Sequence, residues 1–243
     1  MKKTLYTLFA ALAVFAVSCQ PNTPDNPDGP DTPDNPDPEE PEYVAPVTID
    51  GNFDDWAKID ASKLFVADCA AESKTKALKT LKVYMDELFV FFYFEYDDAL
   101  LPDKSDVQCH FYFNADNDET TGGYANQFST GCFEYMCEGH IFRNDAICSF
   151  DPSVNAWVGD TGAMGWDWET VYPSGSGIFE GNGKDGKYEV ALTRESFQEL
   201  GEEFQFGMDI QQSWNSVGIL PNGNMTDDNT EGKAAPLSVK VSG

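Results

Sequence analysis

The chain has 243 residues, and 42 aspartates and glutamates against 15 lysines and arginines give it a formal net charge of −27 at pH 7. Such an acidic surface repels phosphate backbones, which proteins bind through clusters of lysine and arginine, so a nucleic-acid partner is excluded. The same charge argues against binding of anionic lipid headgroups by a folded domain.

Residues 1–18 predict a secretory signal peptide. Lys2 and Lys3 provide a positive start, and residues 4–17 are almost uninterruptedly apolar. This apolar stretch is shorter than a comfortable membrane span, as in signal peptides.

The end of this segment, Ala16-Val17-Ser18-Cys19, resembles the lipobox of bacterial lipoproteins, although Ala16 stands where leucine is common. The resemblance implies cleavage before Cys19 and acylation of its thiol, and several acyl chains anchor a protein without a transmembrane helix. We therefore expect a lipid-anchored protein of the bacterial cell envelope, in the outer membrane, with its periplasmic or surface side left open. The alternative is an ordinary signal peptide followed by a chance cysteine.

Residues 19–45 predict a disordered, acidic tether behind the lipidated cysteine. Prolines recur every two to four residues, and the segment carries acidic residues and no basic one. Proline favours extended backbone and like charges repel, so the segment is a solvated spacer. At about 3 Å per residue it could span several tens of ångströms.

Residues 46–243 predict one all-β domain, an antiparallel, jelly-roll-like β-sandwich with at most one short helix. Residues 81–84 lead through Asp86-Glu87 into the apolar and aromatic residues 88–96, a hairpin whose second strand is apolar on both faces and therefore central. Further strands are predicted at 107–113, 132–142, 188–192, 204–210 and 237–241, with a turn at 181–186 and a helix at 194–200 that has Thr193 as its N-cap.

Five cysteines follow Cys19, and their pairing stays open. They are Cys69, Cys109, Cys132, Cys137 and Cys148. Their spacing matches no zinc site. Two disulfides with one free thiol, or buried free thiols that act as small hydrophobic residues, both fit an exported protein.

Four segments in order resemble family 9 carbohydrate-binding modules and related DOMON-like sandwiches. Residues 47–56 contain a strand, Asp50-Gly51 and Trp56; residues 83–90 match a hairpin with an acidic turn; residues 113–122 match a strand followed by an acidic Thr-Gly loop. Residues 188–192 match a strand before a short helix, although the family's proline is absent and Glu189 lies two positions early. The resemblance implies a sandwich that binds sugar between tryptophans, with Trp56 in its core.

The acidic loop after residues 107–113 predicts a calcium site. Calcium takes six to eight oxygen ligands at about 2.3–2.6 Å, and Asp116, Asp118 and Thr121 offer side-chain oxygens within six residues. Gly122-Gly123 lets the backbone fold around such an ion. The loop lacks the spacing of an EF-hand, and a solvated acidic turn is the alternative.

Four tryptophans are the candidate ligand-binding residues: Trp157, Trp166, Trp168 and Trp214 all lie in segments rich in Gly, Asn and Asp. The apolar face of a sugar ring packs well on an indole. If the backbone is extended, Trp166 and Trp168 point to the same side. The alternative is that these indoles are buried, as is common in sandwiches.

Nothing in the sequence predicts catalysis. His110 and His140 fall on strands, facing opposite to the phenylalanines, and are expected on a solvated face. Serine-nucleophile, zinc-protease and nucleotide-binding motifs are absent. The sequence therefore predicts a non-catalytic envelope lipoprotein that captures glycan, with calcium as a structural ion. The alternatives are a structural or partner-docking lipoprotein without sugar binding and, third, a hydrolase with two carboxylates about 5 to 9 Å apart.

Overall fold

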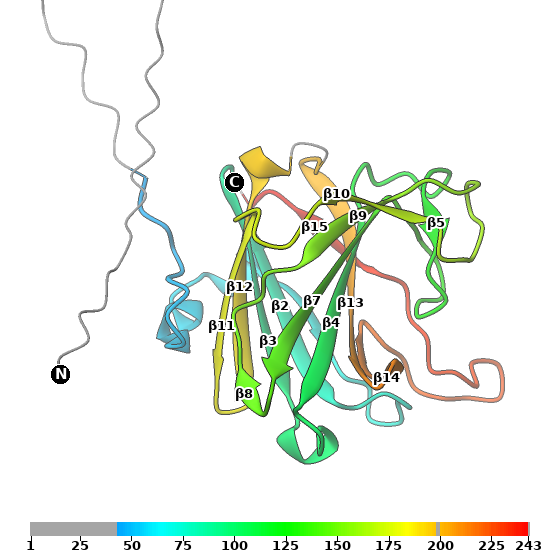
Figure 1. Ribbon diagram of the computed structural model, residues 1–243, viewed down its shortest axis with the longest axis horizontal. Coiled ribbons are helices and arrows are strands. Elements are labelled where there is room, and N and C mark those ends of the chain that lie inside the picture. Colours follow the sequence, from blue (N-terminus) through cyan, green and yellow to red (C-terminus); the bar gives the residue numbers. More distant parts are fainter. Residues whose placement is uncertain (1–42, 198–199, 243) are drawn as a thin grey trace, which may run out of the picture. The chain divides into compact units, whose positions relative to one another are not determined.

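The strands of the computed structural model form two antiparallel sheets that face each other (Figure 1). The structure describes residues 43–197 and 200–242. The predicted signal peptide, Cys19 and nearly all of the predicted tether lie outside these residues.

The first sheet has five strands in the order β1-β2-β3-β12-β11. Its central strand β3 follows β2 through a turn in which Asp86 Oδ1 accepts the N–H groups of Leu88 and Phe89. The predicted hairpin is confirmed. The strands are β1 (Phe65–Asp68), β2 (Leu78–Met85), β3 (Phe89–Tyr96), β11 (Phe179–Lys184) and β12 (Lys187–Thr193).

The second sheet runs in the order β10-β9-β7-β4-β13-β14, with β15 also paired to β13 and β8 to β7. Its strands are β4 (Asp106–Asn114), β7 (Tyr135–Arg143), β8 (Ala146–Ile147), β9 (Ser153–Trp157), β10 (Trp168–Tyr172), β13 (Glu203–Gln212), β14 (Asn215–Leu220) and β15 (Leu237–Lys240). A separate ribbon pairs β5 (Gly123–Tyr124) with β6 (Cys132–Phe133). The predicted all-β, antiparallel sandwich is confirmed.

Three local predictions were wrong. The strand expected at 132–142 is interrupted at Glu134, which separates β6 from β7. The turn expected at 181–186 is reduced to Asp185-Gly186, because β11 includes Gly181, where a Cβ would lie 2.7 Å from Phe150 Cβ. The helix expected at 194–200 is a 3-10 turn, without a side-chain cap from Thr193. The described 3-10 helices are η1 (Phe53–Ala57), η2 (Ala61–Lys63), η3 (Asp98–Leu100) and η4 (Arg194–Ser196).

The main core lies between the two sheets and consists largely of phenylalanine. The ring centroid of Phe92, on β3, lies 5.0 Å from that of Phe111 on β4 and 4.7 Å from that of Phe206 on β13. Full burial of each such side chain stabilises the fold by about 1.5–3 kcal/mol. Cys109 and Cys137 are buried in this core. All five cysteines after Cys19 are free thiols, so the structure does not contain the two disulfides that the sequence left open.

A second buried layer covers the outer face of the first sheet. Trp56, only 3% exposed, packs there against Tyr93. Glu189 accepts hydrogen bonds from the backbone N–H groups of Asp50 and Gly51, at 3.1 and 2.9 Å, and from Trp56 Nε1 at 3.2 Å. Trp56 is thus buried as expected, but it lies outside the space between the two sheets. Burial raises the pKa of the Glu189 carboxyl, which accepts the hydrogen bond from the Trp56 indole.

Glu189→Gln should weaken the fold. One carboxylate oxygen accepts the two backbone N–H groups and the other accepts the indole N–H, so an amide must turn its NH₂ group toward one of these donors. We expect a loss of about 1–3 kcal/mol in the free energy of unfolding, measured by urea titration. Glu180→Gln, at an exposed position of the neighbouring strand β11, should stay within about 0.5 kcal/mol. Equal stability of the two variants would contradict this role.

Candidate functional site

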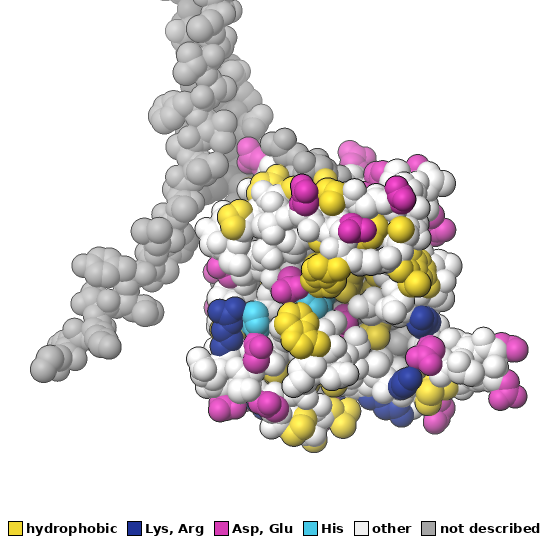
Figure 2. Space-filling view, turned by 45° about the vertical axis from the view of Figure 1, so that its right-hand side comes forward, with side chains coloured by type: hydrophobic (Ala, Val, Ile, Leu, Met, Phe, Trp, Pro, Cys, Tyr) yellow, Lys and Arg dark blue, Asp and Glu magenta, His cyan; other side chains and the backbone are white. Residues whose placement is uncertain are grey.

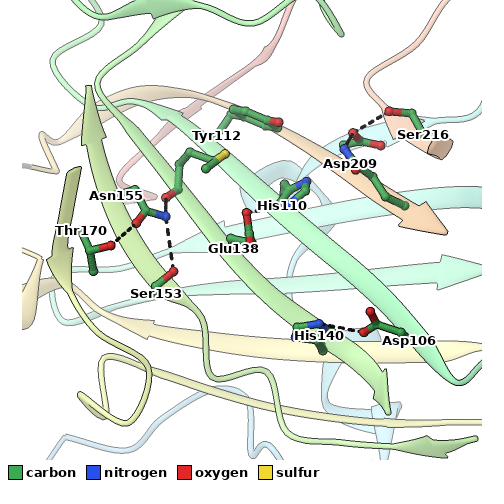
Figure 3. Close-up of polar contacts among 12 residues, drawn as sticks. Asp106, His110, Tyr112, Glu138, His140, Ser153, Asn155, Thr170, Asp209 and Ser216 are labelled. Atoms are coloured by element: carbon green, nitrogen blue, oxygen red, sulfur yellow. Dashed lines mark hydrogen bonds and ion pairs between the residues drawn. The ribbon is translucent and has the colours of Figure 1, made fainter. Parts of the chain in front are cut away.

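The outer face of the second sheet carries buried polar side chains (Figure 3). On β4, Phe111 and its alternate neighbours point into the main core, so His110 and Tyr112 point to the outer face. His110 is only 2% exposed. The prediction of a solvated strand face was therefore wrong for His110, because part of this face is covered by another segment of the chain.

The cover comes from the segment between β4 and β7. Phe128 packs in a cluster with Tyr112, Phe133 and Met136 on this face. Opposite Tyr112, β13 has Gly207, where a Cβ would lie 2.2 Å from Phe128 Cζ. Glycine at this position therefore allows the phenyl ring to lie directly on the sheet and hold the segment there.

Asp209 is the central polar residue of this face. It is fully buried, and its Oδ2 accepts hydrogen bonds from Ser216 Oγ at 2.7 Å, Gln211 Nε2 at 2.7 Å and Gln127 Nε2 at 3.4 Å. Burial raises the pKa of Asp209, and these hydrogen bonds oppose the rise. Its Oδ1 has no hydrogen-bond partner among the described residues. One carboxylate thus joins β13, β14 and the covering segment.

His110 lies between two carboxylates, because Asp209 and Glu138 are its opposite neighbours on β13 and β7. Its Nε2 is 3.4 Å from Glu138 Oε2, an ion-pair distance without hydrogen-bond geometry, and this contact lowers the pKa of Glu138. Neither ring nitrogen is hydrogen-bonded within the described chain. Buried polar atoms in proteins are normally hydrogen-bonded, so His110 is an exception on this face of the sheet.

His140 differs from His110 because both of its ring nitrogens contact side chains of the protein. Its Nδ1 accepts a hydrogen bond from Arg143 at 2.8 Å, and its Nε2 lies 2.8 Å from Asp106 Oδ1. Burial and the nearby guanidinium lower its pKa, which favours the neutral ring with its proton on Nε2. Both of its nitrogens are therefore occupied by protein groups.

An aromatic cavity of about 200 Å³ opens beside the polar row. Trp166 is 65% exposed at its rim, and Trp168 extends into it from β10. In Figure 2 hydrophobic side chains lie next to the histidines on this side of the molecule. The residues that matter for its chemistry are Tyr112, Tyr124, Gln127, Met136, Trp166 and Trp168.

Asn155 links β10, the strand that carries Trp168, to the rest of the sheet through side-chain hydrogen bonds. Its Nδ2 donates to the carbonyl of Met136 at 3.2 Å and to Ser153 Oγ at 3.3 Å, and its Oδ1 accepts from Thr170 Oγ1 at 2.8 Å. These bonds join β7, β9 and β10 (Figure 3). Asn155 therefore reinforces the backbone pairing of β9 with β10, the strand on which Trp168 lies.

The four predicted tryptophans have different environments. Trp166 and Trp168 line the same cavity, as their spacing suggested. Trp157 is half-buried, donates its indole N–H to the Asp160 carbonyl at 3.1 Å and packs edge-on against Trp168, with ring centroids 5.1 Å apart. Trp214 is 66% exposed in the β13–β14 turn and does not line the cavity. Sequence reasoning missed Tyr112, Gln127 and Asp209, which lacked a local motif.

The predicted calcium loop gathers oxygens around one hydroxyl. Thr121 Oγ1 lies 3.2 Å from Asp116 Oδ2, 3.0 Å from the Asp118 carbonyl and 2.7 Å from Glu134 Oε1. Burial raises the pKa of Glu134, which the sequence did not single out. Within residues 43–197 and 200–242, however, no group of three His, Cys, Asp or Glu side chains is arranged to hold a metal ion. Calcium at Asp116, Asp118 and Thr121 stays a prediction.

Comparison with protein-family models gives no match to this chain, and comparison with curated proteins gives none either. The resemblance to family 9 carbohydrate-binding modules therefore rests on the four sequence segments. In the described part of the chain, no helix has the length and apolar character needed to cross a membrane.

Asp209 should make stability depend on pH. Because burial raises its pKa above the ordinary 3.8, the folded state binds a proton more readily than the unfolded state. The resulting stabilisation is complete below the unfolded pKa and is lost as pH rises through the folded pKa. We expect wild type to gain more free energy of unfolding than Asp209→Asn when the buffer is changed from about pH 7 to about pH 4, measured by urea titration.

The exposed Glu203, on the same strand, provides the control for this measurement. Glu203→Gln should follow the wild-type dependence on pH. Identical pH slopes for wild type and Asp209→Asn would show that the buried carboxyl does not titrate as its environment implies.

Proposed function

We propose that this protein is a non-catalytic lipoprotein of the bacterial envelope whose β-sandwich binds carbohydrate in the aromatic cavity. The observation that carries the proposal is the joint placement of Trp166, Trp168 and Tyr112 around one cavity beside a row of buried polar side chains. Ligand sites typically combine apolar walls with a few placed polar groups.

The chemistry of a sugar ring matches both parts of this site. The C–H face of a pyranose is apolar and packs on the exposed indole of Trp166. Its hydroxyl groups donate and accept hydrogen bonds, which the amide of Gln127 and the hydroxyl of Tyr124, both in the cavity lining, can complement. The cavity residues named above carry no charge, so binding through hydroxyls and ring faces is favoured over binding of ionic groups.

The attachment part of the proposal depends on the N-terminal sequence. Acyl chains on Cys19 would anchor the protein in the outer membrane, and the acidic, proline-rich residues 20–45 would hold the sandwich away from the lipid. Calcium at the Asp116 loop would serve as a structural ion and takes no part in the sugar contacts proposed here.

Trp166→Ala should remove most of the sugar affinity. Glycans retained by the purified protein on a polysaccharide array would be tested by affinity gel electrophoresis, and we expect at least a tenfold loss, about 1.4 kcal/mol. The unfolding temperature should stay close to wild type because the indole is exposed. Trp214→Ala is the matched control, with equal exposure outside the cavity, and should bind as wild type does.

An equal loss in both tryptophan variants would contradict the assignment to this cavity. Binding of no glycan by the wild-type protein would contradict the proposed function and favour the alternative of a partner-docking lipoprotein.

Cys19→Ser should release the protein from membranes, because the hydroxyl does not replace the thiol as the acylation site. Fractionation of cells and partitioning into detergent would measure the change. Continued partitioning of the variant into the detergent phase would refute acylation at Cys19 and leave the sugar-binding proposal untouched.

A further inference from the structure

A second cavity adjoins the aromatic one. It measures about 220 Å³, and both cavities are lined by Asn126 and Gln127. These two residues therefore form a common wall, with one cavity on each side. The chemistry of the second cavity is set by Lys74, Thr75, Ser216, Glu231 and Lys233.

Hydrogen bonds to the outer face of the second sheet hold the common wall in place. Gln127 Nε2 donates to Tyr112 Oη at 3.1 Å and to Asp209 Oδ2 at 3.4 Å. Ser216, in the second cavity, donates to the same Asp209 oxygen at 2.7 Å. Tyr112 belongs to the first cavity, so one hydrogen-bond network positions both cavities relative to each other.

The two cavities differ in character. The first is formed mostly by aromatic rings and methionine side chains, which suit the apolar face of a sugar. In the second, Lys74 and Glu231 form an exposed ion pair at 3.1 Å, and Lys233 has no carboxylate within 4 Å among the described residues. Ammonium groups donate and carboxylates accept hydrogen bonds, so this cavity suits a hydroxyl-rich group with little apolar surface.

The size of the cavities also points to shared use. Sites for small ligands usually measure about 300–1,000 Å³, and each cavity alone is smaller than this. Together they reach the lower part of that range. A ligand that fills both must cross the wall formed by Asn126 and Gln127.

We propose, on the basis of the function proposed above, that the two cavities are adjacent subsites for one oligosaccharide. One sugar ring packs against Trp166 and Trp168, and the next crosses Gln127 and bonds its hydroxyls to Lys233 and the Lys74–Glu231 pair. The ligand class is therefore a chain of at least two sugars.

Calorimetric titration with saccharides of increasing length tests this inference. The probes are glucose, cellobiose and cellotriose. The corresponding mono-, di- and trisaccharides of the xylose, mannose and maltose series are titrated in the same way. In the series that binds, we expect affinity to rise at least tenfold from monosaccharide to disaccharide. Lys233→Ala should lower disaccharide affinity to the monosaccharide value, whereas Trp166→Ala should weaken both. Lys240→Ala, an exposed lysine on β15 outside both cavities, is the control.

The outcomes separate the two proposals. Equal affinities for monosaccharide and disaccharide, or an unchanged disaccharide affinity in Lys233→Ala, would overturn the second subsite while sugar binding in the aromatic cavity stands. Absence of binding for every series would overturn both.

Discussion

The structure depends on carboxylates buried away from lysine and arginine. Glu189 on the outer face of the first sheet and Asp209 on that of the second are both fully buried, and neither has a lysine or arginine within ion-pair distance in the described chain. Burial of an unpaired carboxylate is costly unless hydrogen bonds compensate. Each of the two therefore requires a particular set of donors, and most of those donors come from segments outside the strand that carries the carboxylate.

This requirement explains why both outer faces of the sandwich carry ordered irregular segments. Glu189 collects the backbone of Asp50 and Gly51 and the indole of Trp56, so the chain before β1 lies on the first sheet. Asp209 collects Gln127 and Ser216, so the segment after β4 lies on the second. Hydrogen bonds to a charged acceptor are stronger than neutral ones and give these segments a defined position. In the proposed function, the second segment supplies one wall of the ligand site.

The sequence predicted the strands whose pattern is local. The apolar run in β3 and the alternation in β4 and β13 identify a sandwich, since burial on one or both faces of a strand leaves a direct trace in the residue order. The resemblance in residues 47–56 identified Trp56 as buried, but not its position outside the sheet pair. Strand β11 was mistaken for a turn, because its glycines serve close packing and look the same as turn glycines.

The candidate site was predictable only in part. The spacing of Trp166 and Trp168 placed both indoles on one side, and the structure brings them into one cavity. Tyr112 and Asp209 come from strands far apart in the chain, and only the register of β4 and β13 places them on one face. His110 was expected in solvent for a different reason. A strand pattern shows which way a side chain points, but it does not show whether another segment of the chain covers that side chain.

Gly207 has a consequence for how such a site can change. Phe128 occupies the volume that any other side chain at this position would need, so the covering segment and a methyl group compete for one place on the sheet. The shape of the aromatic cavity is thereby linked to a residue that does not line it. In the proposed function, a substitution of that single glycine alters recognition while every side chain proposed to contact sugar keeps its identity.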